Sequence, residues 1–185
     1  MMKKQEAIEN ITQTFVRQIK TTWQIFFLIP VFLYLLSMLH SFLIQPPLRI
    51  SDITILKNID LLSFFIALIL ALWIFRLKRK YLSARYSHRV TEDALQTRSE
   101  ISLEDILQQI FSTLTEKMRL VWALGGLLIL DGVIFYWVTY SSRNMHLYFI
   151  IGVFSLFLNY PRRELFADIP LFVMDARKRI REEGE

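Results

Sequence analysis

The sequence predicts an all-α polytopic membrane protein with four transmembrane helices arranged as two helical hairpins. Three observations support this fold class. Hydrophobic residues make up 54% of the 185 residues, whereas soluble domains are usually about half apolar or less. The apolar residues are concentrated in four blocks. Most Lys and Arg residues lie before the first block, between the second and third, and after the fourth.

The predicted spans are residues 23–44, 57–76, 118–140 and 144–160. A hydrocarbon core of ~30 Å needs about 20 helical residues to cross it. The first and third blocks reach that length unaided. The second and fourth have shorter apolar centres, which flanking residues complete because Lys and Arg can extend their charges to the interface. A soluble helical bundle is disfavoured, since four such blocks exceed what the core of so short a chain can cover.

The basic residues predict the orientation of the chain. The loop between the first two spans and the loop between the last two carry only Arg49, Lys57 and Arg143. Cytoplasmic loops are enriched in Lys and Arg, so both termini and the loop at 77–117 are expected in the cytoplasm. We expect an integral protein of the bacterial cytoplasmic (inner) membrane.

Basic residues beside the predicted spans are candidates for contacts with lipids or partner proteins. They are Arg76, Lys78, Arg79, Lys80, Arg162 and Arg163. A basic cytoplasmic face beside anionic lipid accounts for the formal net charge of +5, and the chain carries no recognisable nucleic-acid motif. The expected partners are membrane lipids and either other membrane protein subunits or further copies of this chain, without nucleic acid.

Amphipathic segments flank the spans. In the lead-in at 1–22 and in a second segment at 102–117, apolar residues recur at helical spacing. Each is expected either to lie on the membrane surface or to continue straight into its span. In the tail at 161–185, the apolar run "IPLFVM" precedes a charged stretch. This pattern is typical of an interfacial or partner-docking helix.

The two halves of the chain follow a similar plan. A gapless pairing of Ile8–Trp23 with Leu103–Met118 places Glu9 opposite Glu104. Each half then contains an amphipathic segment, a span, an outer loop, a second span and a basic exit. A true duplication predicts a pseudo-twofold axis along the membrane normal. Any two helical hairpins would show the same plan, so both interpretations remain open.

Asp131 is an acid within the third predicted span, ~18 Å along the helix from Arg119. A carboxylate at such a depth costs several kcal/mol unless it is protonated, paired or hydrated, and it usually faces the bundle interior. Asp131 either exchanges a proton or cation during transport, or accepts hydrogen bonds that fix the helix register. Its isolation from a second intramembrane acid favours the structural role. His40 is the first candidate partner, and Arg49, Arg143 and His146 in the outer loops could also reach it. In the structural role, the hydrogen-bond donors are Tyr34, Ser37, Ser63 or His40.

Three glycines lie in the same predicted span as Asp131. Gly125, Gly126 and Gly132 are expected to let another helix approach closely, because small residues bring helix backbones together in membranes.

No cofactor, metal site or enzyme activity is expected. The chain has no cysteine, which excludes disulfides and thiolate catalysis. His40 and His146 have no His or acid three or four residues away, and His88 has only Glu92, whereas a metal site needs three or four convergent ligands. Haem would require an axial histidine, and His40 lies too near the interface. Phosphate-binding loops and nucleophile elbows are absent from the sequence.

The sequence is compatible with three functions. A non-catalytic structural or accessory subunit of a larger inner-membrane complex fits the apolar spans and the amphipathic cytoplasmic flanks. A small proton- or cation-coupled transporter or channel would work as an oligomer through Asp131. A membrane enzyme acting on lipid or quinone would need polar residues gathered at one membrane face. The sequence favours the subunit, with the transporter as its alternative.

Overall fold

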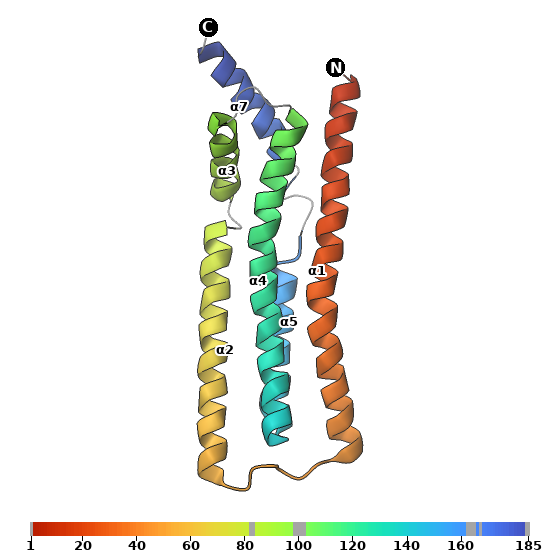
Figure 1. Cartoon of the computed structure of the whole chain (residues 1–185), viewed down its shortest axis with the longest axis vertical. Coiled ribbons are helices and arrows are strands. Elements are labelled where there is room, and N and C mark those ends of the chain that lie inside the picture. Colours follow the sequence, from red (N-terminus) through yellow and green to blue (C-terminus); the bar gives the residue numbers. More distant parts are fainter. Residues whose placement is uncertain (1, 82–83, 98–102, 162–165, 167, 184–185) are drawn as a thin grey trace. The chain divides into compact units, whose positions relative to one another are not determined.

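The computed structural model describes residues 2–81, 84–97, 103–161, 166 and 168–183. Its helices are α1 (Met2–Ile44), α2 (Ile53–Tyr81), α3 (Ala84–Thr97), α4 (Leu103–Thr139), α5 (Ser142–Leu158) and α7 (Ile169–Glu183) (Figure 1). Every regular element within these residues is a helix, so the predicted all-α class is confirmed.

Three helices are long and apolar enough to cross a membrane: the Asn10–Ile44 part of α1, all of α2, and all of α4. They indicate an integral membrane protein. Helix α5 is also apolar but has 17 residues, which correspond to about 25 Å. That length is below the ~30 Å of a hydrocarbon core, so the fourth predicted span, at 144–160, is not confirmed.

Both amphipathic lead-ins belong to long continuous helices. Helix α1 has 43 residues and α4 has 37, so the segments predicted at 1–22 and 102–117 continue straight into the apolar stretches that follow. The long loop between the second and third predicted spans contains α3, and the tail forms the amphipathic helix α7. Of the two options that the sequence left open for the lead-ins, the structure has the continuous helix.

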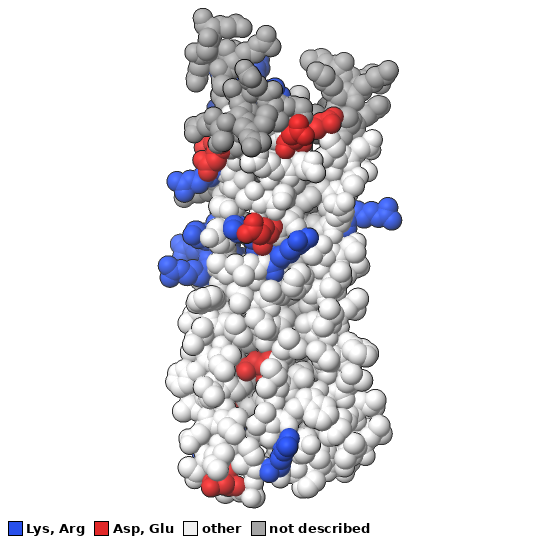
Figure 2. Space-filling model, in the orientation of Figure 1, with Lys and Arg blue, Asp and Glu red and all other residues white. Residues whose placement is uncertain are grey.

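The chain forms two compact units. The apolar unit comprises Trp23–Leu77 and Leu120–Tyr160, and the charged unit comprises Met1–Thr22, Lys78–Arg119 and Pro161–Glu185. The space-filling view in Figure 2 shows few charged side chains on the visible face of the apolar unit.

In the apolar unit, α4 lies between α1 and α2 (Figure 1), and both flanking helices also contact α5. Tyr34 of α1 stacks on Phe149 of α5, with ring centroids 3.6 Å apart, whereas Ala67 of α2 packs on Tyr148 of α5. The loop between α1 and α2 passes the end of α4, where the Arg49 backbone N–H donates to the Thr139 carbonyl. The described contacts of α1 and α2 are thus with α4 and α5, and the predicted pair of hairpins is not confirmed.

In the charged unit, the first part of α1 packs beside the first part of α4. The rings of Phe15 and Phe111 stack with centroids 4.2 Å apart, and Phe166 meets Phe15 edge-on at 5.2 Å. Ile19 of α1 and Ile110 of α4 are also buried. Apolar residues at helical spacing on each lead-in therefore bury their faces against each other, which is where an amphipathic helix outside lipid gains its stability.

Candidate functional site

Asp131 lies at the junction of α2, α4 and α5. The Ser63 hydroxyl of α2 donates a hydrogen bond of 3.0 Å to its Oδ2. Asp131 is half-buried and Ser63 is buried. The acid predicted at this depth therefore joins α4 to α2 through the Ser63 hydroxyl.

A second polar contact, one turn away along α2, connects that helix to α5. The side-chain amide of Asn144 on α5 donates to the carboxylate of Asp60 on α2. Asp60 precedes Ser63 by three residues, so both lie on one face of α2. The two contacts form a polar seam, which we define as Asp60, Ser63, Asp131 and Asn144.

Beyond Ser63, the same face of α2 becomes apolar. Ala67 packs on Leu128 and Tyr148, and two turns later Ile74 packs on Val121 and Leu124. Three of these side chains, those of Val121, Leu128 and Tyr148, are at most 2% exposed. The other three, those of Ala67, Ile74 and Leu124, are 7% exposed. The polar seam therefore ends against two apolar layers between α2 and α4.

His40 takes part in a different contact. Its Nδ1 lies 2.7 Å from the hydroxyl of Tyr136 on α4. On the same face of α1, Ser37 accepts a hydrogen bond of 2.9 Å from the Trp137 indole N–H. The structure therefore does not pair His40 with Asp131. Its hydrogen bond fastens α1 to α4, whereas Ser63 and Asp131 fasten α2 to α4.

A third polar residue of α1 reaches α5. The Tyr34 hydroxyl lies 2.9 Å from Nδ1 of His146. Tyr34, Ser37 and His40 are spaced three residues apart, which places them along one side of the helix. These three contacts form the α1 clasp, defined as Tyr34, Ser37 and His40 with their partners Tyr136, Trp137 and His146.

Two tryptophans satisfy backbone carbonyls at the end of α5. The Trp23 indole N–H donates to the Leu156 carbonyl at 3.1 Å, and the Trp122 indole N–H donates to the Asn159 carbonyl at 2.8 Å. The last four carbonyls of a helix have no partner within it, and an unpaired carbonyl away from water is costly. Both indoles are buried, so α1 and α4 together stabilise the end of the short helix.

The three predicted glycines lie at helix contacts. A Cβ added at Gly125 would lie 3.0 Å from a Leu156 methyl group, and one at Gly132 would lie 3.1 Å from the Met145 Cα, both on α5. Gly126 faces α1, with the Pro30 ring 3.2 Å away. The glycines thus bring both α5 and α1 close to α4.

Gly152 makes the tightest of these contacts, and sequence reasoning did not single it out. A Cβ there would lie 2.5 Å from Cγ1 of Ile129 and 3.0 Å from the Gly125 backbone oxygen. The available signal was its position in an apolar helix otherwise built from large residues.

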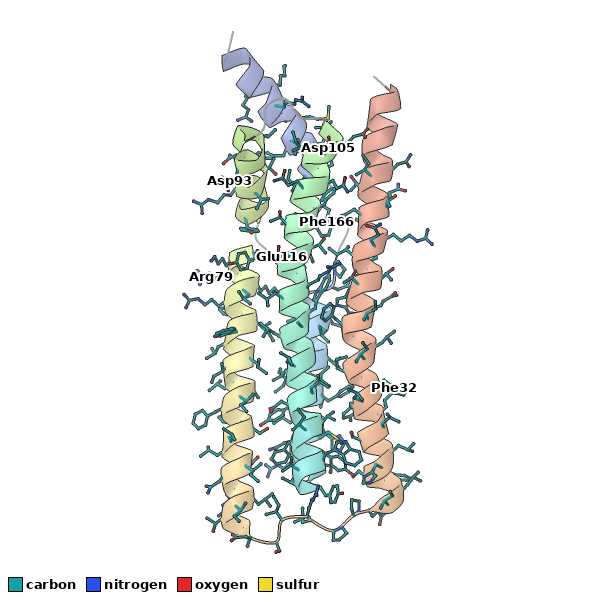
Figure 3. The ribbon with its side chains drawn as sticks, viewed as in Figure 1. Phe32, Arg79, Asp93, Asp105, Glu116 and Phe166 are labelled. Atoms are coloured by element: carbon teal, nitrogen blue, oxygen red, sulfur yellow. The ribbon has the colours of Figure 1, made fainter. Side chains whose placement is uncertain are left out.

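The basic residues predicted on α2 lie at the C-terminal end of that helix. Lys78, Arg79 and Lys80 lie in its last turn and Arg76 just before it. Arg79 extends away from the other helices in Figure 3. Arg162 and Arg163 lie outside the described residues.

A hollow of about 740 Å³ lies between α1 and α4 in the charged unit. Its lining includes the stacked rings of Phe15 and Phe111, and charged residues surround them. Those charged residues are Glu104, Asp105, Glu116 and Arg119. The hollow therefore combines an aromatic surface with an excess of acidic side chains.

No group of three or more His, Asp or Glu side chains suited to a metal ion occurs within the described residues. Comparison with known protein families, with curated proteins and with solved structures found no match. The class that the fold defines is an all-helical integral membrane protein.

Proposed function

We propose that this chain is a non-catalytic structural or accessory subunit of a larger inner-membrane protein complex. In this proposal it has four transmembrane helices, with α5 as the fourth, and both termini and the charged unit are cytoplasmic. It packs against neighbouring subunits through apolar transmembrane faces and through its cytoplasmic amphipathic helices.

The observation that carries the proposal is the use of polar side chains inside the apolar unit. The polar seam joins α2 to α4 and α5, and the α1 clasp joins α1 to the same two helices. Lipid supplies no hydrophobic force between helices, so hydrogen bonds and close packing must hold them together. Assembly is therefore a sufficient role for these polar groups.

The outer faces of α1 and α2 are the surfaces available to neighbours. Within the most apolar stretch of each helix, only 17% of the residues are buried. Phe32 of α1 is 60% exposed and extends away from the other helices (Figure 3), and Phe64 of α2 is 51% exposed. Such faces suit lipid or the helices of another subunit.

The acidic hollow of the charged unit supports docking outside the membrane. Its length along α4, from Glu104 to Arg119, corresponds to about 22 Å of helix. A groove lined by both aromatic and polar side chains suits an amphipathic segment of a partner.

Extraction in mild detergent followed by size separation tests the proposal. We expect the chain to migrate with other polypeptides in a defined ratio. Migration of the chain alone, as a homo-oligomer, would contradict the subunit role and favour the transporter.

Tags at the two termini and in the loop at 45–52 test the topology. Both terminal tags should be accessible only from the cytoplasm, and the loop tag only from outside. Terminal tags in opposite compartments would contradict a fourth span at α5.

The alternative function is a proton- or cation-coupled transporter or channel component. The polar seam favours it, because the Asp60–Asn144 contact lies one turn along α2 from Ser63, which donates to Asp131. The two apolar layers that follow on α2 argue against a continuous polar route along that interface.

Replacing Asp131 by Asn separates these functions. Asparagine keeps an oxygen that accepts the Ser63 hydrogen bond but cannot carry the charge. If the chain is a structural subunit, the Asp131→Asn variant should assemble with its partners, and the activity of the complex should be unchanged. Intact assembly with loss of proton or cation flux into proteoliposomes would favour transport.

A further inference from the structure

Positive charges from two helices converge on one aromatic ring in the charged unit. Lys80 Nζ lies 4.9 Å from the centroid of the Tyr81 ring, at the end of α2. Lys117 Nζ, on α4, lies 5.8 Å from the same centroid. Sequence reasoning included Lys80 among the basic contacts but gave no role to Lys117, which is 37 residues further along the chain.

The surrounding side chains hold Lys117 in place. Its side chain is 29% exposed and forms an ion pair of 3.1 Å with Glu116. The ring of Tyr86 on α3 meets Tyr81 edge-on, with centroids 5.0 Å apart. Burial raises the pKa of Tyr86, so its hydroxyl stays neutral and adds no negative charge. Glu116 is the acid paired with Lys117, and Lys78 and Arg79 add two more cations in the last turn of α2.

The position of this cluster along α2 points to its ligand. Lys78, Arg79 and Lys80 form the basic last turn of a helix long and apolar enough to span a membrane. Earlier on the same helix, Trp73 is 60% exposed, and tryptophan is enriched where a span meets the headgroups. Anionic phospholipids are the anions concentrated at that depth on the cytoplasmic side.

We propose that Lys80 and Lys117, arranged around Tyr81, bind the phosphodiester of an anionic phospholipid headgroup. Each ammonium can donate a charge-assisted hydrogen bond to a phosphate oxygen, while the Tyr81 ring, which both ammonium groups approach, stabilises both positive charges. Lys78 and Arg79 strengthen the attraction. The inference rests on the membrane placement in the proposed function but requires no partner subunit.

Native mass spectrometry of the purified full chain tests this site. The chain is released from detergent micelles doped with phosphatidylglycerol or with phosphatidylcholine, and the retained lipid is measured. We expect phosphatidylglycerol to be retained in preference. Each lysine near a charged lipid surface contributes about fivefold in affinity, so a Lys80→Gln, Lys117→Gln variant should lose about 25-fold.

Two further variants make the test specific. The Arg17→Gln, Arg89→Gln variant has the same net charge as the lysine variant but keeps the cluster, so it should retain phosphatidylglycerol. The Lys80→Arg, Lys117→Arg variant keeps the positive charges and should retain it as well. Equal losses in the lysine and arginine-to-glutamine variants would mean general charge attraction and overturn the site.

Two other results would also overturn it. One is equal retention of both lipids by the unaltered chain. The other is displacement of phosphatidylglycerol by inorganic phosphate, which would identify a free-phosphate site instead. Because the chain is measured alone, failure to find partner subunits would leave this result unaffected.

Discussion

Helices α2 and α4 are both apolar enough to cross a membrane, yet their surroundings differ. In the most apolar stretch of α4, 61% of the residues are buried, against 17% in α2. Helix α4 carries Gly125, Gly126 and Gly132, which face α5 and α1, whereas α2 has no glycine. Glycines, rather than hydrophobicity, distinguish the helix at the centre of the apolar unit from the one at its edge.

The difference in burial between α2 and α4 has a physical reason. Leucine loses nothing when it faces lipid instead of another helix, so apolar character alone does not draw helices together. Close backbone approach at glycines and hydrogen bonds between helices do. Helix α4 has both kinds of contact on two sides, and α2 depends on the polar seam and two small apolar layers.

The largest effect is expected from filling the contact between α4 and α5. In a Gly152→Val variant, the side chain would overlap Ile129 and the backbone of Gly125, and overpacking of this kind costs about 3 kcal/mol. Thermal unfolding in mild detergent would measure the loss of stability. Ile150→Val, on the same helix but 64% exposed, is the control and should change little. Equal stability of both variants would show that α5 does not need this close approach.

A leucine-to-alanine pair sharpens the contrast between α4 and α2. Leu128 of α4 is 1% exposed and Leu62 of α2 is 61% exposed. Leu128→Ala should lower the free energy of unfolding by about 2 kcal/mol, because it leaves a cavity. Leu62→Ala should change it by less than about 0.5 kcal/mol, as at other surface positions. A large effect at Leu62 in the isolated chain would mean that α2 is packed against a second copy.

The smallest effect is expected from a tryptophan pair. Trp122→Phe removes the hydrogen bond to the Asn159 carbonyl and should cost about 1 kcal/mol. Trp73 of α2 is 60% exposed, so Trp73→Phe serves as the matched control. Unfolding monitored by circular dichroism in detergent compares the two. If both variants unfold like the unaltered chain, the end of α5 does not depend on the Trp122 indole.

Part of the site followed from the sequence. Ser63 was one of four hydrogen-bond donors predicted for a structural role of Asp131, and it is the one that donates to that acid. The preferred candidate, His40, contacts Tyr136 instead. Sequence spacing shows which residues share a helix face, but the choice between α1 and α2 as the neighbour of Asp131 depends on how the helices are ordered around α4.

The contacts of Asn144, Gly152 and Lys117 were not predicted for the same reason. Each involves a residue on another helix, namely Asp60, Ile129 and Tyr81. Gly152 lies in a helix of large apolar residues, and Lys117 is one of many basic residues in its loop. Neither has a local pattern that identifies its partner.

By itself, the sequence determined the helical class, the apolar lengths of α1, α2 and α4 and the depth of Asp131 within its helix, because these depend on composition and on helical spacing along one segment. Only the tertiary structure decided that α4 lies between α1 and α2 in the apolar unit, and that separate polar contacts fasten each flanking helix. That order is set by side-chain fit and hydrogen bonds between helices, and lipid-facing apolar residues carry no information about it.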